Sequence, residues 1–103
     1  MEKKEYILCA AIWYKDQPTS KQLPVNIDRG VVVCGHRHAD CLHTFVALTG
    51  KRSVVPECGQ YEQGFITNFN DFVSRETAAI IAKKANQIIS FATVERLYSE
   101  DLY

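Results

Sequence analysis

The sequence lacks an excess of charge of either sign, because 12 lysines and arginines balance 12 aspartates and glutamates. A chain without a net positive field lacks the basis for salt-dependent binding to long nucleic acid, so we expect no DNA partner. A long apolar run is missing too. The stretch from Tyr6 to Tyr14 is stopped by Lys15, too early to cross a bilayer or to form a signal peptide. We therefore expect a cytoplasmic protein that does not bind a membrane.

Linkers and paired cysteine motifs are also missing. No Pro-, Gly- or Ser-rich stretch divides the 103 residues, which predicts a single domain over residues 1–103. The four cysteines show no Cys-x-x-Cys spacing, so free thiols in a reducing compartment are the expected state. With 47% apolar and 23% charged residues, the composition is that of an ordinary globular protein.

The patterns that are present predict an α+β fold, in which a small antiparallel or mixed sheet packs against two main helices. The apolar run Tyr6–Tyr14 predicts the central strand, because its length suits a strand covered on both faces. Further strands are expected at Val31–Cys34, Gly64–Thr67 and Ile88–Thr93. Loops are expected at Lys15–Gly30 and Lys51–Gln63, which carry proline, glycine and polar residues without periodicity.

Two segments show helical spacing. In His38–Thr49 the apolar residues recur every three or four positions, and Gly50 supplies the left-handed residue that commonly ends a helix. The second helix begins after Ser74, with Glu76 in its first turn and two lysines near its end, as the helix dipole favours. The tail Leu97–Tyr103 is short and amphipathic.

Three histidines and a cysteine, the potential ligands His36, His38, Cys41 and His43, lie close together in the sequence. Imidazole and thiolate are ligands that suit zinc. If the helix begins near His38, however, His38 faces the core while His43 points away, so a single ion could not easily collect them. We therefore expect no metal, and interpret the cluster as a hydrogen-bonded histidine, a buried cysteine and a surface histidine.

The same strand-to-helix junction is a candidate anion site. Gly35 permits a tight turn, and Arg37 and His38 lie where free backbone N–H groups point outward at a helix start, an arrangement that suits phosphate. The alternative is an exposed arginine and a hydrogen-bonded histidine at an ordinary helix start.

The segment from Gly64 to Arg75 interleaves phenylalanines with amides. The ring of Phe65 could stack on a base, and an amide such as Asn70 could bind the edge of that base. The alternative is that the phenylalanines are core residues and the polar residues only make a turn. For Phe72 we favour this alternative, because a hydrophobic residue just before a helix cap commonly packs onto the first turn.

Signatures of catalysis are missing. The sequence has no Gly-x-Ser-x-Gly motif, no phosphate-binding Gly-rich loop and no paired catalytic carboxylates other than Glu100 and Asp101 near its end. We therefore expect a binding protein with no catalytic residues. Glu100 and Asp101 could accept hydrogen bonds from ribose hydroxyls or cap a partner subunit.

Short motifs spread over most of the chain resemble the first-described Thoeris anti-defence sponge family of phage proteins. The motifs are Gly35–Asp40, Gly64–Thr67, Phe72–Ala78, Gln87–Ile88 and Leu97–Tyr103. The resemblance implies a phage protein of the host bacterial cytoplasm that sequesters, without cleaving, the cyclic ADP-ribose isomers made by TIR-domain enzymes. Some members of that family also hold cyclic oligonucleotides at a separate site. They assemble as dimers that can associate further, so the resemblance implies a homodimer of this chain, with a higher assembly such as a hexamer left open.

The resemblance also implies roles for individual residues. Phe65 would stack on the adenine, Ser74 and Arg75 would contact polar parts of the ligand, and Arg37 and His38 would lie near the phosphates. Two departures leave the choice of ligand open: Ser74 replaces the expected acid or amide, and the loop Lys51–Gln63 is long.

Capture without turnover must rely on affinity. Nanomolar binding corresponds to about 12 kcal/mol, which one shallow face of a small monomer could hardly supply, so we expect the pocket at a subunit interface. Two other functions remain open. One is a small metal-assisted hydrolase that uses His36, His38 and Cys41. The other is a phage inhibitor that binds a host protein directly through an apolar face.

Overall fold

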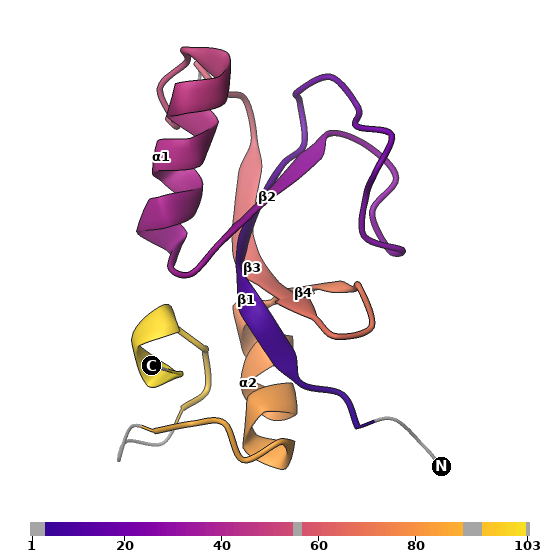
Figure 1. Ribbon diagram of the computed structural model, residues 1–103, viewed down its shortest axis with the longest axis vertical. Coiled ribbons are helices and arrows are strands. Elements are labelled where there is room, and N and C mark those ends of the chain that lie inside the picture. The colour runs from indigo at the N-terminus through magenta and orange to yellow at the C-terminus, as the bar shows by residue number, and fades with distance from the viewer. Residues whose placement is uncertain (1–3, 55–56, 90–93, 103) are drawn as a thin grey trace.

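Four strands form one antiparallel sheet in the order β2-β1-β3-β4, which we describe from a computed structural model (Figure 1). The structure describes residues 4–54, 57–89 and 94–102. The strands are β1 (Ile7–Tyr14), β2 (Val31–Gly35), β3 (Tyr61–Thr67) and β4 (Phe72–Ser74). The helices are α1 (His38–Thr49), α2 (Arg75–Lys84) and the short 3-10 helix η1 (Ser99–Asp101). The expected α+β fold, a small sheet with two main helices, is confirmed.

Strand β1 lies inside the sheet, as its apolar run predicts. On one face, Ala10, Ile12 and Tyr14 belong to the larger core, which includes residues of α1, α2 and the C-terminal segment. On the other face, Ala11 packs with Ile27 and with residues of β3 and β4 in a second, smaller core. The strand is thus covered on both faces, although only the first face carries helices.

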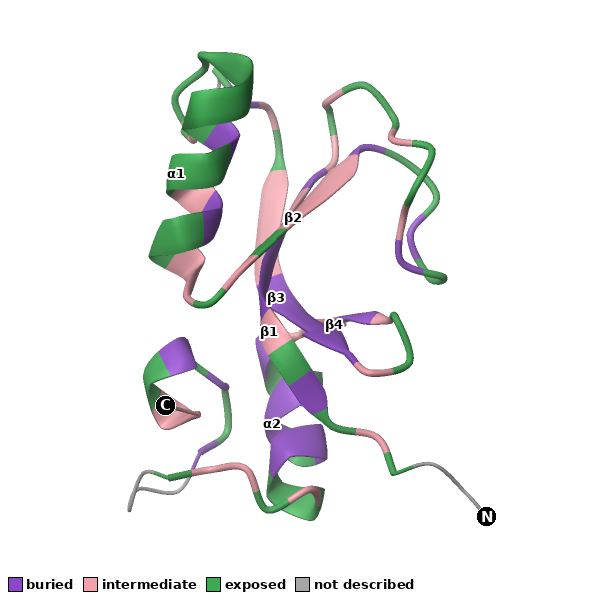
Figure 2. Cartoon of the chain, in the orientation of Figure 1, coloured by how far each residue is buried: buried purple, intermediate pink, exposed green. Residues whose placement is uncertain are grey.

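Helix α1 buries a narrow stripe against the sheet and exposes its outer side (Figure 2). Phe45 of this helix stacks on Tyr14 of β1, with ring centroids 3.9 Å apart and an interplanar angle of 11°. Gly50 ends the helix in the left-handed conformation, with φ of 73°, as expected. Both bounds of α1 therefore match the prediction from the sequence.

Strand β3 is longer than predicted, because residues that we expected in a loop pair with β1. Tyr61, Glu62 and Gln63 pair with Tyr14, Trp13 and Ile12. Strand pairing uses backbone groups and does not require apolar side chains. The polar side chains of this segment therefore gave no strand pattern in the sequence. Strand β4 was missed as well, because three residues directly before a helix are too few to show a period.

The expected strand at Ile88–Thr93 is wrong for its first two residues, which lie outside any strand. The N–H of Ile89 instead donates to the carbonyl oxygen of Asp101 at 2.8 Å. Residues 90–93 of that prediction lie outside the described residues. The contact ties the chain after α2 to the C-terminal segment Val94–Leu102, which carries the yellow 3-10 helix beside α2 and near the start of α1 (Figure 1).

Candidate functional site

The C-terminal segment connects the first residues of the two main helices, which are His38 of α1 and Arg75 of α2. Ring atom Nδ1 of His38 lies 3.1 Å from the hydroxyl oxygen of Ser99. The guanidinium Nη1 of Arg75 donates to the carbonyl oxygen of Leu97 at 2.8 Å. One short stretch of chain therefore holds two of the residues that we expected to contact a ligand.

His38 is held as a neutral imidazole between β3 and the C-terminal segment. Its Nε2 lies 2.8 Å from the carbonyl oxygen of Gly64, which can only accept, so Nε2 carries the proton and Nδ1 accepts from Ser99. Burial lowers the pKa of His38 from its ordinary value, and the nearby charge of Arg75 acts in the same direction. Both effects oppose a second proton on the ring.

Arg75 is buried, with 9% of its surface exposed, although arginine is rarely buried in globular proteins. Besides Leu97, its guanidinium binds Gln63, donating from Nη2 to Oε1 at 2.6 Å. The guanidinium carbon also lies 4.4 Å from the centroid of the Tyr98 ring, a cation–π contact. Tyr98 is itself 45% exposed, so an aromatic surface next to a cation is open to solvent.

The start of α1 already holds an anionic group of its own. The N–H of Arg37, the N-cap residue, donates to Oδ2 of Asp40 at 3.0 Å, and the carbonyl oxygen of Arg37 accepts from the N–H of Asp40. One donor that we expected to be free at this helix start therefore has a carboxylate acceptor. Any phosphate near Arg37 would have to approach beside that carboxylate.

Phe65 lies in the core. Its exposed fraction is 0%, and its ring forms a T-shaped contact with the His38 ring, with centroids 5.0 Å apart and an interplanar angle of 86°. Neither face of the ring is open for stacking in the single chain. In this structure Phe65 is therefore a core residue, as the alternative interpretation of the sequence had it. The reason is that β3 is an inner strand and points this side chain at the helices.

Ser74 caps α2, as the sequence indicated. Its hydroxyl oxygen accepts from the N–H of Thr77 at 3.2 Å. The exposed Glu76 of the first turn forms an ion pair with Arg96 at 3.1 Å. Ser74 directly precedes Arg75 in the sequence and is half-buried.

Asn70 and Asp101, which we also expected to contact the ligand, have different positions. Asn70 lies apart from this group, whereas Asp101 holds the C-terminal segment in place. Asn70 adopts a φ of 62° in the turn between β3 and β4, and it lines a pocket of about 190 Å³ on the sheet face opposite the helices, beside Cys34 and Ile66. Asp101 accepts a hydrogen bond from the N–H of Tyr98 at 3.0 Å and thereby caps η1. The structure thus brings His38 and Arg75 to the C-terminal segment, with Arg37 and Ser74 next to them in the sequence, whereas Asn70 lies on the other face of the sheet.

A scan against protein families matches residues 6–103 to the model described as phage T4 y16D protein. This match covers nearly the whole chain. The chain belongs to the phage T4 y16D protein family. No curated protein and no solved structure matches it. The y16D match agrees with the expectation of a phage protein and names no ligand.

Potential metal ligands are not gathered in the y16D-family chain. Among residues 4–54, 57–89 and 94–102, no three of the histidine, cysteine, aspartate and glutamate side chains could hold one ion together. Both ring nitrogens of His38 face other partners, and the buried thiol of Cys41 points to the carbonyl oxygens of Ala10 and Arg37. The set that the hydrolase alternative needs is therefore not assembled in this part of the chain.

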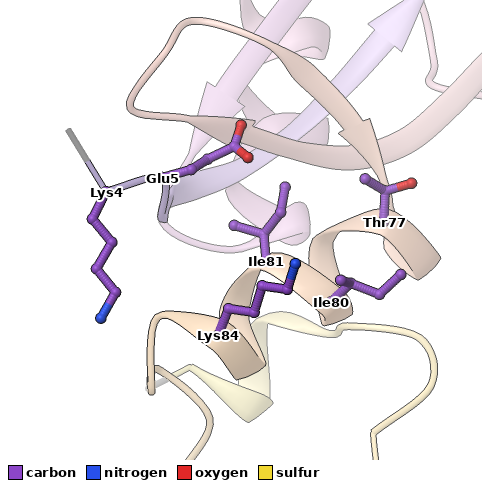
Figure 3. A pocket seen from close by; sticks show the side chains of 6 residues that line it. All are labelled: Lys4, Glu5, Thr77, Ile80, Ile81 and Lys84. Carbon is purple, nitrogen blue, oxygen red and sulfur yellow. The ribbon is translucent and has the colours of Figure 1, made fainter. Parts of the chain in front are cut away.

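A larger pocket, of about 440 Å³, lies between α2 and the chain before β1 (Figure 3). Its lining consists of Lys4, Glu5, Thr77, Ile80, Ile81 and Lys84. None of the residues that we expected to bind a ligand is among them. In the same described part of the y16D-family chain, no helix is long and apolar enough to span a bilayer.

Sequence reasoning missed three residues of the candidate site, namely Gln63, Tyr98 and Ser99. Tyr98 and Ser99 belong to the motif Leu97–Tyr103 that carries the family resemblance, and this was the available signal. Gln63 gave none, because we expected it in a loop. Its role depends on strand β3, which places its amide beside the guanidinium of Arg75.

Proposed function

We propose that this phage protein binds and sequesters a cyclic ADP-ribose-type signal without cleaving it, and so blocks TIR-based Thoeris immunity of the host cell. The motifs that resemble the sponge family support the proposal, and so does membership of a phage protein family. The ligand carries two phosphates, two riboses and a purine. Binding it requires cations, hydrogen-bonding groups and an aromatic face, and does not require a general base.

The observation that carries this proposal is the contact between Arg75 and Tyr98. The ring of Tyr98 is 45% exposed and has the guanidinium of Arg75 at 4.4 Å. A purine stacks on such a ring, and the adjoining cation attracts its phosphates. Phe65 is buried, so we assign the stacking role to Tyr98 in its place.

The neighbours of this pair suit the other parts of the ligand. Glu100 is exposed and close enough to His38 and Arg75 to influence the pKa of both. A carboxylate is a strong acceptor for ribose hydroxyls. Arg37 lies at the start of α1, next to His38, and supplies a second cation for the phosphates.

We propose further that two copies of the chain complete the site. Nanomolar capture needs about 12 kcal/mol, and neither the 440 Å³ pocket nor the 190 Å³ pocket is lined by Arg75 or Tyr98. If the open surface around Arg75 and Tyr98 pairs with a second copy of the chain, the two copies together enclose the ligand, which one chain does not. Dimers of this kind could associate further, and a second site could hold a cyclic oligonucleotide.

The test is a recovery experiment. The protein is incubated with a cyclic ADP-ribose isomer, separated from unbound nucleotide and denatured, and the released nucleotide is identified by mass spectrometry. Sequestration predicts that intact ligand is recovered in stoichiometric amount. Recovery of a cleaved nucleotide would replace the proposal with an enzyme, and stoichiometric zinc in the purified protein would point to the metal-assisted hydrolase.

A second candidate function is direct binding of a host protein through the groove between α2 and residues Lys4 and Glu5. It is favoured by one observation: Ile80 is 57% exposed at the 440 Å³ pocket (Figure 3). A thermal-shift panel separates the two functions, because a ligand that binds only the folded state raises the melting temperature. No shift with cyclic ADP-ribose isomers or cyclic oligonucleotides, together with loss of anti-defence activity in Ile80→Glu, would favour protein binding.

A further inference from the structure

Two of the four cysteines are neighbours on adjacent strands. Cys34 of β2 pairs with Ala11 of β1, and Cys9 lies two positions before Ala11 in the same strand. Side chains two apart in a strand point to the same face, so Cys9 and Cys34 occupy diagonal positions on one face of the sheet. This face is opposite the helices and separate from the surface formed by Arg75 and Tyr98.

The two thiols contact each other and are accessible from solvent. They are close enough to shift each other's pKa, Cys34 is exposed, and Cys9 is half-buried. Cys34 also lines the 190 Å³ pocket, whose other walls include Leu23, Val32 and Asn70. A small reagent can therefore reach the pair.

Hydrogen bonding makes the two thiols chemically unequal. The bond to Cys34 lowers the pKa of Cys9 to about 7, while the same bond raises the pKa of Cys34. The pair therefore loses one proton near neutral pH and keeps the second, as expected for two coupled sites. By contrast, burial raises the pKa of Cys41 and of Cys58, and both side chains are buried. The thiolate is the reactive form, so reactivity is concentrated at Cys9.

We propose that Cys9 and Cys34 form a thiol-modification site, which exchanges with a low-molecular-weight disulfide such as oxidised glutathione and closes an intramolecular disulfide. The thiolate of Cys9 attacks one sulfur of the reagent and releases one glutathione thiolate, which takes a proton from solvent. Cys34 then loses its proton and attacks the sulfur of Cys9 in the mixed disulfide, releasing the second glutathione. The protein loses two protons and two electrons, and the reagent gains both to become two thiols.

The strand pairing around Cys9 bears on this closure. Diagonal neighbours in a sheet are farther apart than directly opposed residues, so a disulfide between them requires some backbone movement. The pairing of β1 with β2 ends at Ala10 and Gly35, so Cys9 lies just beyond the last pair. The pairing of β1 with β3 is also irregular between Ile7 and Cys9. Cys9 thus lies at the end of β1 where only β3 still pairs with it, through Ile66.

The test uses the full chain with oxidised glutathione under anaerobic conditions at neutral pH, followed by intact-mass analysis and non-reducing peptide mapping. Wild type should lose two hydrogens and yield one linked peptide pair, Cys9 with Cys34. The Cys34→Ser variant, which changes an exposed side chain, should stop at one glutathionyl group on Cys9. Cys58→Ser is the matched control and should close the disulfide like wild type.

Alkylation of the reduced protein adds a second measurement. Cys9 should react with iodoacetamide at least about tenfold faster than Cys41 or Cys58, because its pKa is lowered towards neutral pH whereas burial raises the pKa of the other two. A wild-type chain that keeps four thiols, carries two glutathionyl groups without a link, or links Cys41 or Cys58 instead would overturn the proposal. These outcomes are independent of nucleotide binding, so they leave the proposed function unaffected.

Discussion

Arg75 places its guanidinium carbon 4.4 Å from the centroid of the Tyr98 ring. The two residues are far apart in the chain but adjacent in space, because the carbonyl of Leu97 accepts a hydrogen bond from the same guanidinium. A buried arginine holds an exposed ring against the start of α2. This relationship makes the C-terminal segment part of a candidate site that also includes His38 of α1, Arg75 of α2 and Gln63 of β3.

Replacement of Phe65 by alanine should destabilise the fold by about 3–5 kcal/mol, because it removes a fully buried ring next to His38. Urea unfolding followed by circular dichroism measures this loss. Replacement of Phe69, which is 41% exposed, by alanine is the matched control and should cost less than about 1 kcal/mol. A Phe65→Ala protein as stable as wild type would show that the ring is not a core residue.

Replacement of Gly64 by alanine should cost at least about 2 kcal/mol, since the added Cβ would overlap the carbonyl oxygen of Val73. Gly50→Ala is the control. Nothing lies within 4 Å of its added Cβ, and only the positive φ of 73° is strained, at about 1 kcal/mol. The melting temperatures of the two variants should fall in that order. The reverse order would contradict the close approach of β3 and β4.

The sequence predicted most accurately those elements in which local and long-range preferences agree. Helix α1 is an example, because its apolar spacing fits the sheet and Gly50 ends it. The site was harder to predict, since the local pattern around Phe65 is the same for a core residue and for a ligand contact. Whether Phe65 is a core residue or a ligand contact depends on β3 being an inner strand. Part of the pairing between β3 and β1 is made by a polar segment, in which the sequence pattern does not indicate a strand.

Tyr98 illustrates the same limit. Its position in the C-terminal motif identified the segment but not its neighbour. Tyr98 contacts Arg75 because the C-terminal segment crosses beside the start of α2. No residue spacing in the sequence indicates a contact between positions so far apart in the chain. The cap of α2 was easier to predict, because Ser74 accepts a hydrogen bond from the N–H of Thr77, only three residues away in the chain.

Stability should fall as the pH is lowered below about 6.5, because of His38. Burial lowers the pKa of His38 below its ordinary value of 6.5, so the unfolded chain binds the proton more readily than the folded chain. The stability that His38 contributes is fully present when the pH is above its pKa in the unfolded chain. It is lost as the pH falls towards the lower pKa of His38 in the folded chain. Urea midpoints between pH 8 and pH 5, in steps, measure it.

His38→Gln should flatten this pH dependence, whereas replacement of the exposed His43 by glutamine should leave it in place. Parallel curves for wild type and His38→Gln would show that another group is responsible. A rise in stability on acidification would contradict the sign derived from the buried imidazole.

Replacement of Ser74 by alanine should destabilise the protein by about 1 kcal/mol, because the N–H of Thr77 loses its acceptor. Ser74→Asp restores a cap and should recover most of this loss. Chemical denaturation measures both variants. Equal loss in the two would show that the hydroxyl contributes through contacts other than the cap.

The central claim is that a purine nucleotide stacks on Tyr98 beside Arg75. Calorimetric titration of a cyclic ADP-ribose isomer into wild type, Tyr98→Phe and Tyr98→Ala tests it most directly, with circular dichroism to verify that each variant is folded. Tyr98→Phe should bind within about threefold of wild type, and Tyr98→Ala should bind about tenfold more weakly or worse, because stacking on a base contributes about 1–3 kcal/mol. Equal affinity in all three proteins, or no binding by any of them, would contradict the account.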